Sequence, residues 1–334
     1  MSATAAPRVG PGVPETEESW EVPDISFAVF VRRLRTNAPL LLGGAMLLVF
    51  GGVALAALAV YGGGLGHLAT DPNVARAFFP PGPSLAHPFG WMNGIGVEIL
   101  SALFQATPFD LAVVGGALSV ALFVGVVLGA YAGFDAGLGD TVVTVAGDLM
   151  VGIPPFFLVM VLFLGIQPFI SASDDLLAFG LLFALVLWPY YARPVRARAQ
   201  AVAHESYVEA ARASGAGPAR LLWRHVVPNS LFPVLAQIPV DVYNIFFVLT
   251  VFPFLACFGG GAGGFFAPLS PLPSSVFPEW GLLLASGACY GFSILPELNH
   301  WWMYVFPLAT ILLFGLAVTL TCDGVERFLR VSRT

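Results

Sequence analysis

Residues 38–61 form an uninterrupted run without a single acidic or basic side chain. About 20 consecutive apolar residues are enough for a helix to cross the hydrocarbon core of a bilayer, so this run predicts a membrane-spanning helix. Further apolar stretches predict spans at about residues 111–131, 141–164, 176–192, 227–254 and 301–322. Because 57% of the residues are hydrophobic and 10% are charged, we predict an all-α integral membrane protein with six transmembrane helices.

The arginines indicate how these spans are oriented. All 14 basic residues are arginine, and six spans with both termini inside place every one except Arg76 on the cytoplasmic side. The sequence therefore predicts a multi-pass protein of the cell membrane with both termini in the cytoplasm. The absence of lysine also excludes a Walker A phosphate loop, so the Gly-rich run at 259–264 is no nucleotide site and the chain is not expected to be an ATPase.

The segments outside the spans differ in composition. Residues 1–25 are rich in Pro, Glu and small residues and are predicted to be a disordered cytoplasmic tail. Residues 26–61 are predicted to form a short amphipathic helix on the membrane surface followed by the first transmembrane anchor. Residues 62–106, heavy in Gly and Pro, are predicted to be an external loop, and 107–330 to hold the other five spans.

The most polar stretch after Trp188 is 204–228, with the sequence HESYVEAARASGAGPARLLWRHVVP. Ser206 and Glu209 have the spacing of a capping box, which predicts reciprocal hydrogen bonds with the backbone at the start of a helix over 207–213. Gly215 is suited to a left-handed residue that ends this helix. So short a helix is marginal alone, and we expect docking to a partner to stabilise it.

This stretch resembles the EAA loop of ABC importer permeases, most closely in the dipeptide/oligopeptide/nickel branch. The similarity lies in Glu209-Ala210-Ala211, in Gly215 four residues later, and in His225 and Pro228-Asn229. It implies a type I ABC importer permease fold, with a permease core at 107–330 and a coupling loop at about 193–226. A short cytoplasmic coupling helix would lie between spans four and five. The residues expected to couple to the ATPase are Ser206, Tyr207, Glu209, Ala210, Ala211 and Gly215.

The resemblance also implies partners. These are a second homologous permease subunit, two ATP-binding cassette subunits that hold ATP and Mg²⁺, and an extracytoplasmic solute-binding protein. The chain itself is expected to bind the lipid bilayer but no cofactor, metal ion or nucleic acid, and its three cysteines and five histidines show no metal-ligand spacing. Buried thiols are the default expectation for the cysteines, although Cys257 and Cys289 could pair on the outer side.

Gln237, Asp241 and Asn244 share one face of the fifth span by their spacing. A carboxylate inside the bilayer needs a partner or an aqueous path. We predict that this polar stripe lines the translocation path, and contact with the partner permease is an equally good alternative. Asp148 is expected to meet interfacial water or the Arg193–Arg198 cluster.

Two outer segments, 90–108 and 248–259, depart from the branch pattern, which indicates a divergent member. The predicted function is a permease subunit of an ATP-driven importer for peptides or a related small solute, with nickel and oligosaccharides as alternative cargoes. A secondary transporter driven by an ion gradient is the main rival, but it would need an internal repeat that the sequence lacks. A membrane scaffold without transport activity is a third alternative.

Overall fold

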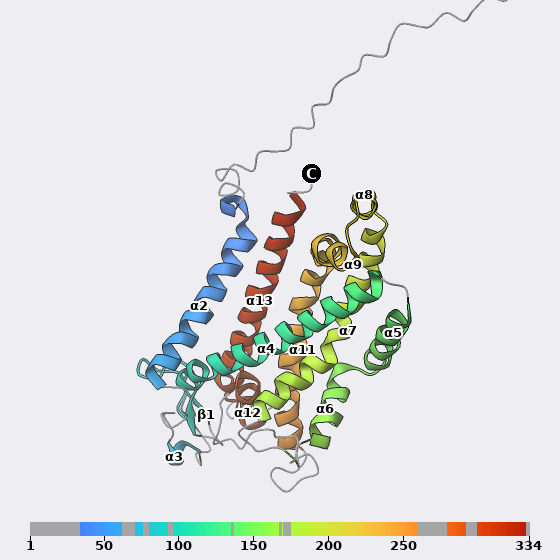
Figure 1. Cartoon of the computed structure of the whole chain (residues 1–334). Coiled ribbons are helices and arrows are strands. Elements are labelled where there is room, and N and C mark those ends of the chain that lie inside the picture. The colour runs from blue at the N-terminus through green and yellow to red at the C-terminus, as the bar shows by residue number, and fades with distance from the viewer. Residues whose placement is uncertain are drawn as a thin grey trace, which may run out of the picture.

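A computed structural model describes residues 34–61, 71–75, 80–92, 96–134, 137–166, 169, 175–258, 279–291 and 299–331. The predicted surface helix falls almost entirely outside these residues, as does the tail at 1–25. Five helices are long and apolar enough to cross a membrane, and a bent pair of helices makes a sixth candidate span. The predicted all-α membrane fold is therefore confirmed (Figure 1).

The first two spans are α2, Ala38–Tyr61, and α4, Ile99–Phe134. The bounds of α2 agree with the prediction. Helix α4 begins well before the predicted start at 111, so the end of the predicted external loop is helical. Pro108 lies inside α4, which is possible because membrane helices tolerate proline.

The third span is bent. Helix α5, Leu138–Val151, and helix α6, Pro155–Ile166, meet at 92°. The prediction of one continuous span over 141–164 is wrong here, because Pro154 and Pro155 cannot donate the backbone hydrogen bonds that would continue α5.

The fourth span, α7 at Asp175–Ala203, continues through its arginines to the start of the coupling loop. The predicted end at Ala192 is too early, since Pro189 and Pro194 both lie inside the helix. After α8, Ser206–Ala213, the fifth span runs without a long break from Pro218 to Leu255. It consists of α9 (Pro218–Leu221), a π-turn (Leu222–Val226), α10 (Val227–Ser230), a 3₁₀ turn (Phe232–Ala236) and α11 (Gln237–Phe258).

At the end of the bundle opposite α8, the segment between the fifth and sixth spans contains α12, Trp280–Gly291, before the sixth span, α13, at Trp302–Val331. Helix α12 is apolar but too short to cross the membrane, so the length of apolar runs did not predict it. Cys289 on α12 is disulfide-bonded, so the expectation of a buried thiol is wrong at this position, while Cys322 is free. The side chain of Cys257 lies outside the described residues.

The described part of the 62–106 loop contains helix α3 and a small sheet. Helix α3 is Pro72–Ala75, and strands β1 (Trp91–Met92) and β2 (Val97–Glu98) pair antiparallel, with Trp91 opposite Glu98. The indole Nε1–H of Trp302 donates to the carbonyl oxygen of Trp91 at 3.1 Å. This contact attaches the two-stranded sheet of β1 and β2 to the start of α13.

Close helix contact and aromatic packing form the core. Gly125, Gly129 and Gly133 of α4 face the backbone of α7, where any added Cβ would collide. Glycines at such spacing let two membrane helices approach closely. Four helices meet at a cluster in which Trp280 of α12 stacks on Phe246 of α11, with ring centroids 5.5 Å apart, beside Phe50 of α2 and Phe314 of α13.

Candidate functional site

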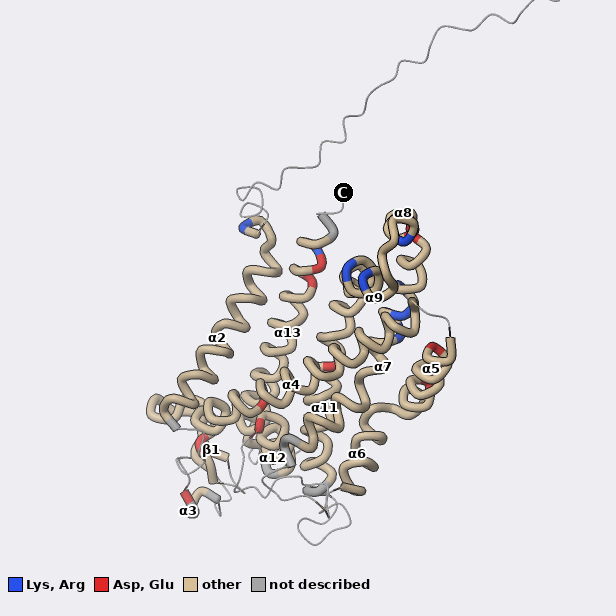
Figure 2. The backbone as a smooth tube through the Cα atoms, viewed as in Figure 1, with Lys and Arg blue, Asp and Glu red and all other residues tan. Residues whose placement is uncertain are grey.

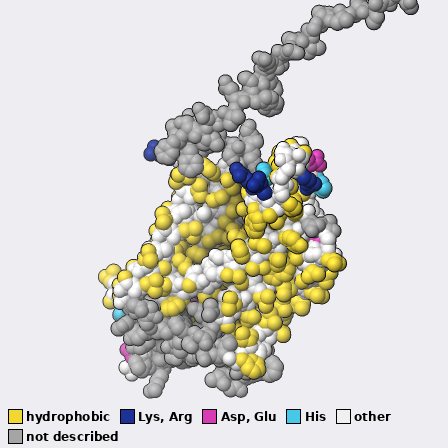
Figure 3. Space-filling view, in the orientation of Figure 1, with side chains coloured by type: hydrophobic (Ala, Val, Ile, Leu, Met, Phe, Trp, Pro, Cys, Tyr) yellow, Lys and Arg dark blue, Asp and Glu magenta, His cyan; other side chains and the backbone are white. Residues whose placement is uncertain are grey.

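Helix α8 lies at one end of the bundle, the same end at which α2 begins and α13 ends (Figure 1). Figure 2 shows that most arginines in the described residues gather at this end, on α7, α8, α9 and their connections. In Figure 3, hydrophobic side chains cover the flank of the bundle, whereas Arg, His and acidic side chains surround α8. This polar end is the candidate functional site.

The start of α8 differs from the prediction. Glu205 is the N-cap, with φ −70° and ψ 143°, and no side chain caps the helix. Glu205 follows a tight turn at the end of α7, in which its N–H donates to the carbonyl oxygen of Val202 at 3.0 Å. Ser206 is therefore already inside the helix, and the predicted capping box of Ser206 and Glu209 does not form. Glu209 lies in the first turn and Arg212 in the last, where both charges favour the helix dipole.

The end of α8 follows the prediction. Gly215 has φ +87°, the left-handed conformation that glycine adopts without strain. The N–H of Ala216 donates to the carbonyl oxygen of Ala211 at 3.1 Å, and the N–H of Gly215 to that of Arg212 at 3.0 Å. This pair of bonds is a Schellman motif, which satisfies carbonyl groups at the helix end and turns the chain toward α9.

One side chain anchors α8 to the membrane domain. Val208 is fully buried and packs with Val202 of α7 and with Leu221 and Val226 of the fifth span. The other predicted coupling residues point outward: Ser206, Tyr207, Glu209 and Ala210 are exposed, and Ala211 is half-buried. Helix α8 is thus attached to the bundle through Val208 and exposed on its opposite face. A helix that docks onto another protein needs such an exposed face.

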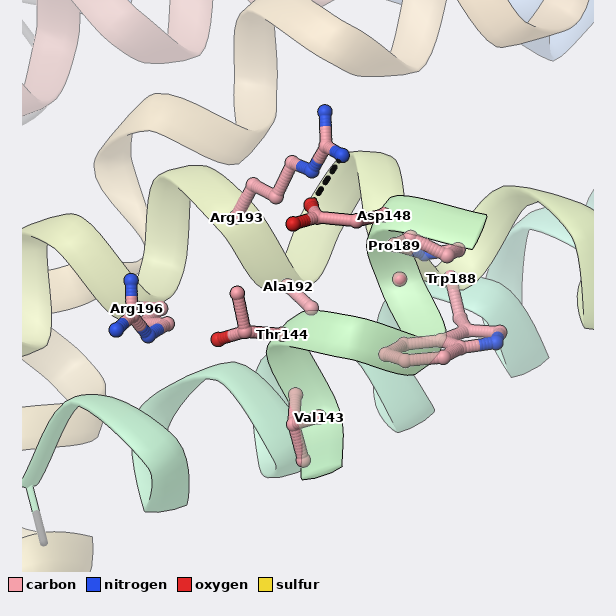
Figure 4. A pocket seen from close by; sticks show the side chains of 9 residues that line it. Val143, Thr144, Asp148, Trp188, Pro189, Ala192, Arg193 and Arg196 are labelled. Atoms are coloured by element: carbon pink, nitrogen blue, oxygen red, sulfur yellow. Dashed lines mark hydrogen bonds and ion pairs between the residues drawn. The ribbon is translucent and has the colours of Figure 1, made fainter. Parts of the chain in front are cut away.

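Two ion pairs join α5 to α7 beside this site, and Figure 4 shows one of them, between Arg193 and Asp148. Arg193 donates to Asp148 at 2.5 Å, which confirms the expected contact of Asp148 with the arginine cluster. Arg196 makes two hydrogen bonds to Asp140, one of them from Nη2 to Oδ2 at 2.8 Å. The pairs bracket a cavity of about 210 Å³, whose apolar walls include Val143, Trp188 and Pro189.

The two ion pairs differ in exposure, and this predicts that they contribute differently to the free energy of unfolding. The side chains of Asp140 and Arg196 are 17% and 30% exposed, whereas those of Asp148 and Arg193 are 59% and 49% exposed. We expect Asp140→Asn to lower the free energy of unfolding by roughly 1–2 kcal/mol, because it removes a paired, charge-assisted contact. Asp148→Asn should cost less than about 1 kcal/mol. Thermal unfolding of the two purified variants checks this, and an equal or reversed order would contradict it.

The predicted path residues form a hydrogen-bonded group. Gln237 Nε2 donates to Asp241 Oδ1 at 3.0 Å, and Asn244 Nδ2 lies 3.4 Å from the same oxygen. Asp241 is fully buried, with Tyr191 of α7 beside its carboxyl group, while Gln237 and Asn244 are half-buried. Within one subunit, the amides and not the carboxylate are the accessible part of this stripe.

The family of proteins described as "Binding-protein-dependent transport system inner membrane component" matches residues 125–331, which is more than half of the chain. The chain belongs to this family. The match begins within α4 and ends at the last residue of α13, so it includes α8, the bent third span and α12.

Curated relatives of this permease are themselves transport permeases. The probable D,D-dipeptide transport system permease protein DdpC of Escherichia coli is 29% identical over 78% of this chain and 78% of its own length. The di/tripeptide transport system permease protein DppC of Pseudomonas aeruginosa is 27% identical over 72% and 75%, respectively. The dipeptide transport system permease protein DppC of Alkalihalophilus pseudofirmus is 27% identical over 73% and 72%. The predicted resemblance to this branch of ABC importer permeases is confirmed.

Sequence reasoning missed the buried residue that fixes the site of this permease. Val208 was read only as one position of a thin helix, although it is the side chain that holds α8 in place. Its signal is a single apolar residue within HESYVEAARAS, flanked on both sides by polar or small residues. A lone valine in a polar helix indicates a contact, but it does not identify the partners, which come from two other segments.

Proposed function

We propose that this permease is one of two membrane subunits of an ATP-driven importer, and that its cargo is a di- or oligopeptide. Separate ATP-binding cassette subunits would hold ATP and Mg²⁺, and an extracytoplasmic solute-binding protein would deliver the cargo. The peptide assignment is supported by the names of the three relatives described above, each of which is a dipeptide or di/tripeptide permease. The observation that carries the ATP-driven mechanism is helix α8, anchored by Val208 and exposed along its outer face.

The proposed orientation places the end with α8 and both termini in the cytoplasm. It is supported by the gathering of arginines at this end, as the positive-inside rule requires (Figure 2). The ATPase subunits would then bind α8 through Tyr207, Glu209, Ala210 and Ala211. The small alanine side chains allow close approach, and Tyr207, which is 43% exposed, offers an aromatic contact.

Coupling would follow from rigidity. A displacement of α8 would be transmitted directly to α7 and the fifth span, because Val208 packs against both of them. The α4–α7 contact and the Arg196–Asp140 pair then carry the displacement to α4 and α5. Movement of these helices against the partner permease would alternate access to a path along which we place Gln237, Asn244 and the buried Asp241.

The test is uptake by the assembled complex, purified through a tag on this subunit and reconstituted in lipid vesicles with its binding protein. We expect labelled dipeptide to accumulate only when ATP and Mg²⁺ are present on the side of the ATPase subunits. Uptake should survive a protonophore and stop when the catalytic residue of the ATPase is replaced. Uptake driven by an ion gradient without ATP would instead identify a secondary transporter and overturn the proposal.

The cargo is tested separately. Identification of ligands that remain bound to the cognate binding protein, by mass spectrometry, should yield short peptides. Nickel or an oligosaccharide in that protein would overturn the peptide assignment and leave the ATP-driven mechanism intact.

A further inference from the structure

Two buried acidic residues meet where α12 contacts α4, at the end of the molecule opposite α8. The carboxyl oxygen Oδ2 of Asp110, on α4, accepts a hydrogen bond from the backbone N–H of Trp280 at 3.0 Å. Glu279 is the residue immediately before Trp280, and its side chain interacts electrostatically with Asp110. Asp110 and Glu279 are each 1% exposed. The first turn of α12 thus brings two carboxyl groups together out of contact with water.

The contact that holds this pair is well defined. The indole Nε1–H of Trp280 donates to the carbonyl oxygen of Leu103 at 3.3 Å, so both ends of Trp280 are bound to α4. The ring of Trp280 belongs to the aromatic cluster with Phe50, Phe246 and Phe314. The two carboxyl groups cannot separate unless this packed residue also moves.

Among the described residues, no basic side chain forms an ion pair with Asp110 or Glu279. Helices α2, α4, α11 and α12 contain no arginine, and the arginines of α13 lie in its last turns, far from Trp302. Both carboxyl oxygens of Glu279 lack a hydrogen-bond partner, since the N–H groups of Gly281 and Leu282 are nearby without meeting hydrogen-bond geometry. The other titratable residues with described side chains on these helices or beside them are Tyr131, Asp241, Tyr243, His300, Tyr304, Cys322, Asp323 and Glu326.

Two ionised carboxylates cannot remain in this position. Removing one carboxylate from water costs several kcal/mol even after relaxation, and a second negative charge beside it adds repulsion. A bound ligand with positive charge is therefore required. A metal ion such as Ca²⁺ needs six or more oxygen ligands, and the described residues contain no group of three or more metal-binding side chains. A proton needs only the two carboxyl groups.

We propose that Asp110 and Glu279 form a proton-binding pair, in which at least one of the two carboxyl groups stays protonated and thereby keeps α12 against α4. Burial, and then the neighbouring Asp110 carboxyl group, raise the pKa of Glu279 well above its usual value, in agreement with this arrangement. Loss of the proton would leave two negative charges in contact and would push the start of α12 away from α4. The proposal concerns the subunit itself and does not depend on which solute is transported.

Infrared spectroscopy of the assembled complex in lipid tests the proposal directly. At neutral pH, the wild-type protein should show the carbonyl stretch of a buried protonated carboxylic acid that exchanges slowly in D₂O. Asp110→Asn combined with Glu279→Gln should remove this band, whereas the exposed carboxyl control Asp323→Asn should leave it unchanged. A wild-type spectrum without the band, or a band that the double variant retains, would overturn the proposal.

The pH dependence of stability gives a second, independent measurement. If the folded pair binds a proton that the unfolded chain releases, stability must fall as pH rises through the release of that proton. The melting temperature of the wild-type complex should therefore fall more steeply with rising pH than that of the double variant. The difference in slope should correspond to one additional proton bound by the folded state. The single variant Asp110→Asn retains an acceptor for the Trp280 N–H and provides a folded reference. Equal slopes, or a melting temperature that Na⁺ or K⁺ raises only in the wild type, would exclude a proton as the ligand.

Discussion

Replacing Gly215 with valine is expected to reduce ATP-driven uptake by about tenfold, while the subunit still inserts into the membrane and the complex still hydrolyses ATP. Gly215 has φ +87°, and a β-branched residue in this conformation costs roughly 1–3 kcal/mol. A free-energy change of this size alters the population of the native turn by roughly 5- to 150-fold. The Schellman motif would open, and α8 would lose the orientation in which we propose that the ATPase subunit binds it.

The control for this prediction lies two residues away. Gly217 has φ −69° and ψ 158°, an extended conformation that suits valine, and open space surrounds the position of its missing Cβ. Gly217→Val should therefore transport normally. Gly215→Asn should fall between the two valine variants, because asparagine tolerates the left-handed region better than other residues. Uptake and ATPase activity are measured on the same vesicles, and similar uptake by both valine variants would contradict the proposed role of the turn.

The second large effect is expected at Gly129, in the middle of the α4–α7 contact. A Cβ at this position would lie 2.9 Å from the Cα of Ala192 and closer still to its carbonyl oxygen. Backbone atoms cannot rotate away as a side chain can, so Gly129→Leu must force the two helices apart. We expect a loss of about 3 kcal/mol or more in the free energy of unfolding, at the upper end of overpacking effects.

The same substitution at Gly115 provides the matched control. Gly115 lies on the same helix, but no atom of another residue comes within 4 Å of its Cβ position. Both substitutions gain the same helix propensity, so their difference reports the steric contact alone. Size-exclusion profiles and melting temperatures of the tagged subunit in detergent are the measurements. Comparable stability of the two leucine variants would show that α4 and α7 can separate at little cost.

The sequence alone was sufficient for the class of fold and for the coupling segment. The spans follow from the length of apolar runs, since a helix in lipid must satisfy its own backbone hydrogen bonds and needs about 20 residues to cross. The left-handed turn at Gly215 follows from a local rule, because few other residues adopt that conformation. Both features depend on neighbours in the chain, which a single sequence contains.

Where local rules competed, the sequence did not decide the outcome. The capping box was predicted from the spacing of Ser206 and Glu209, but the helix begins one residue earlier because the turn after α7 places Glu205 at the cap. Similarly, the predicted spans at 111–131 and 176–192 are shorter than α4 and α7, which continue through Pro108 and Pro194. In contrast, Pro154 and Pro155 do break a helix, and nothing in the sequence distinguishes the two outcomes.

Only the tertiary structure decided which distant residues meet. Asp110 and Glu279 are separated by about half of the chain, and Val208 packs with residues of two other elements, Val202 of α7 and Leu221 and Val226 of the fifth span. The sequence showed each of these residues as a single polar or apolar position, because the free energy of burying a charge or a methyl group depends on what surrounds it. The length of the apolar runs predicts where the helices lie, whereas packing between helices determines which side chains are anchored or paired.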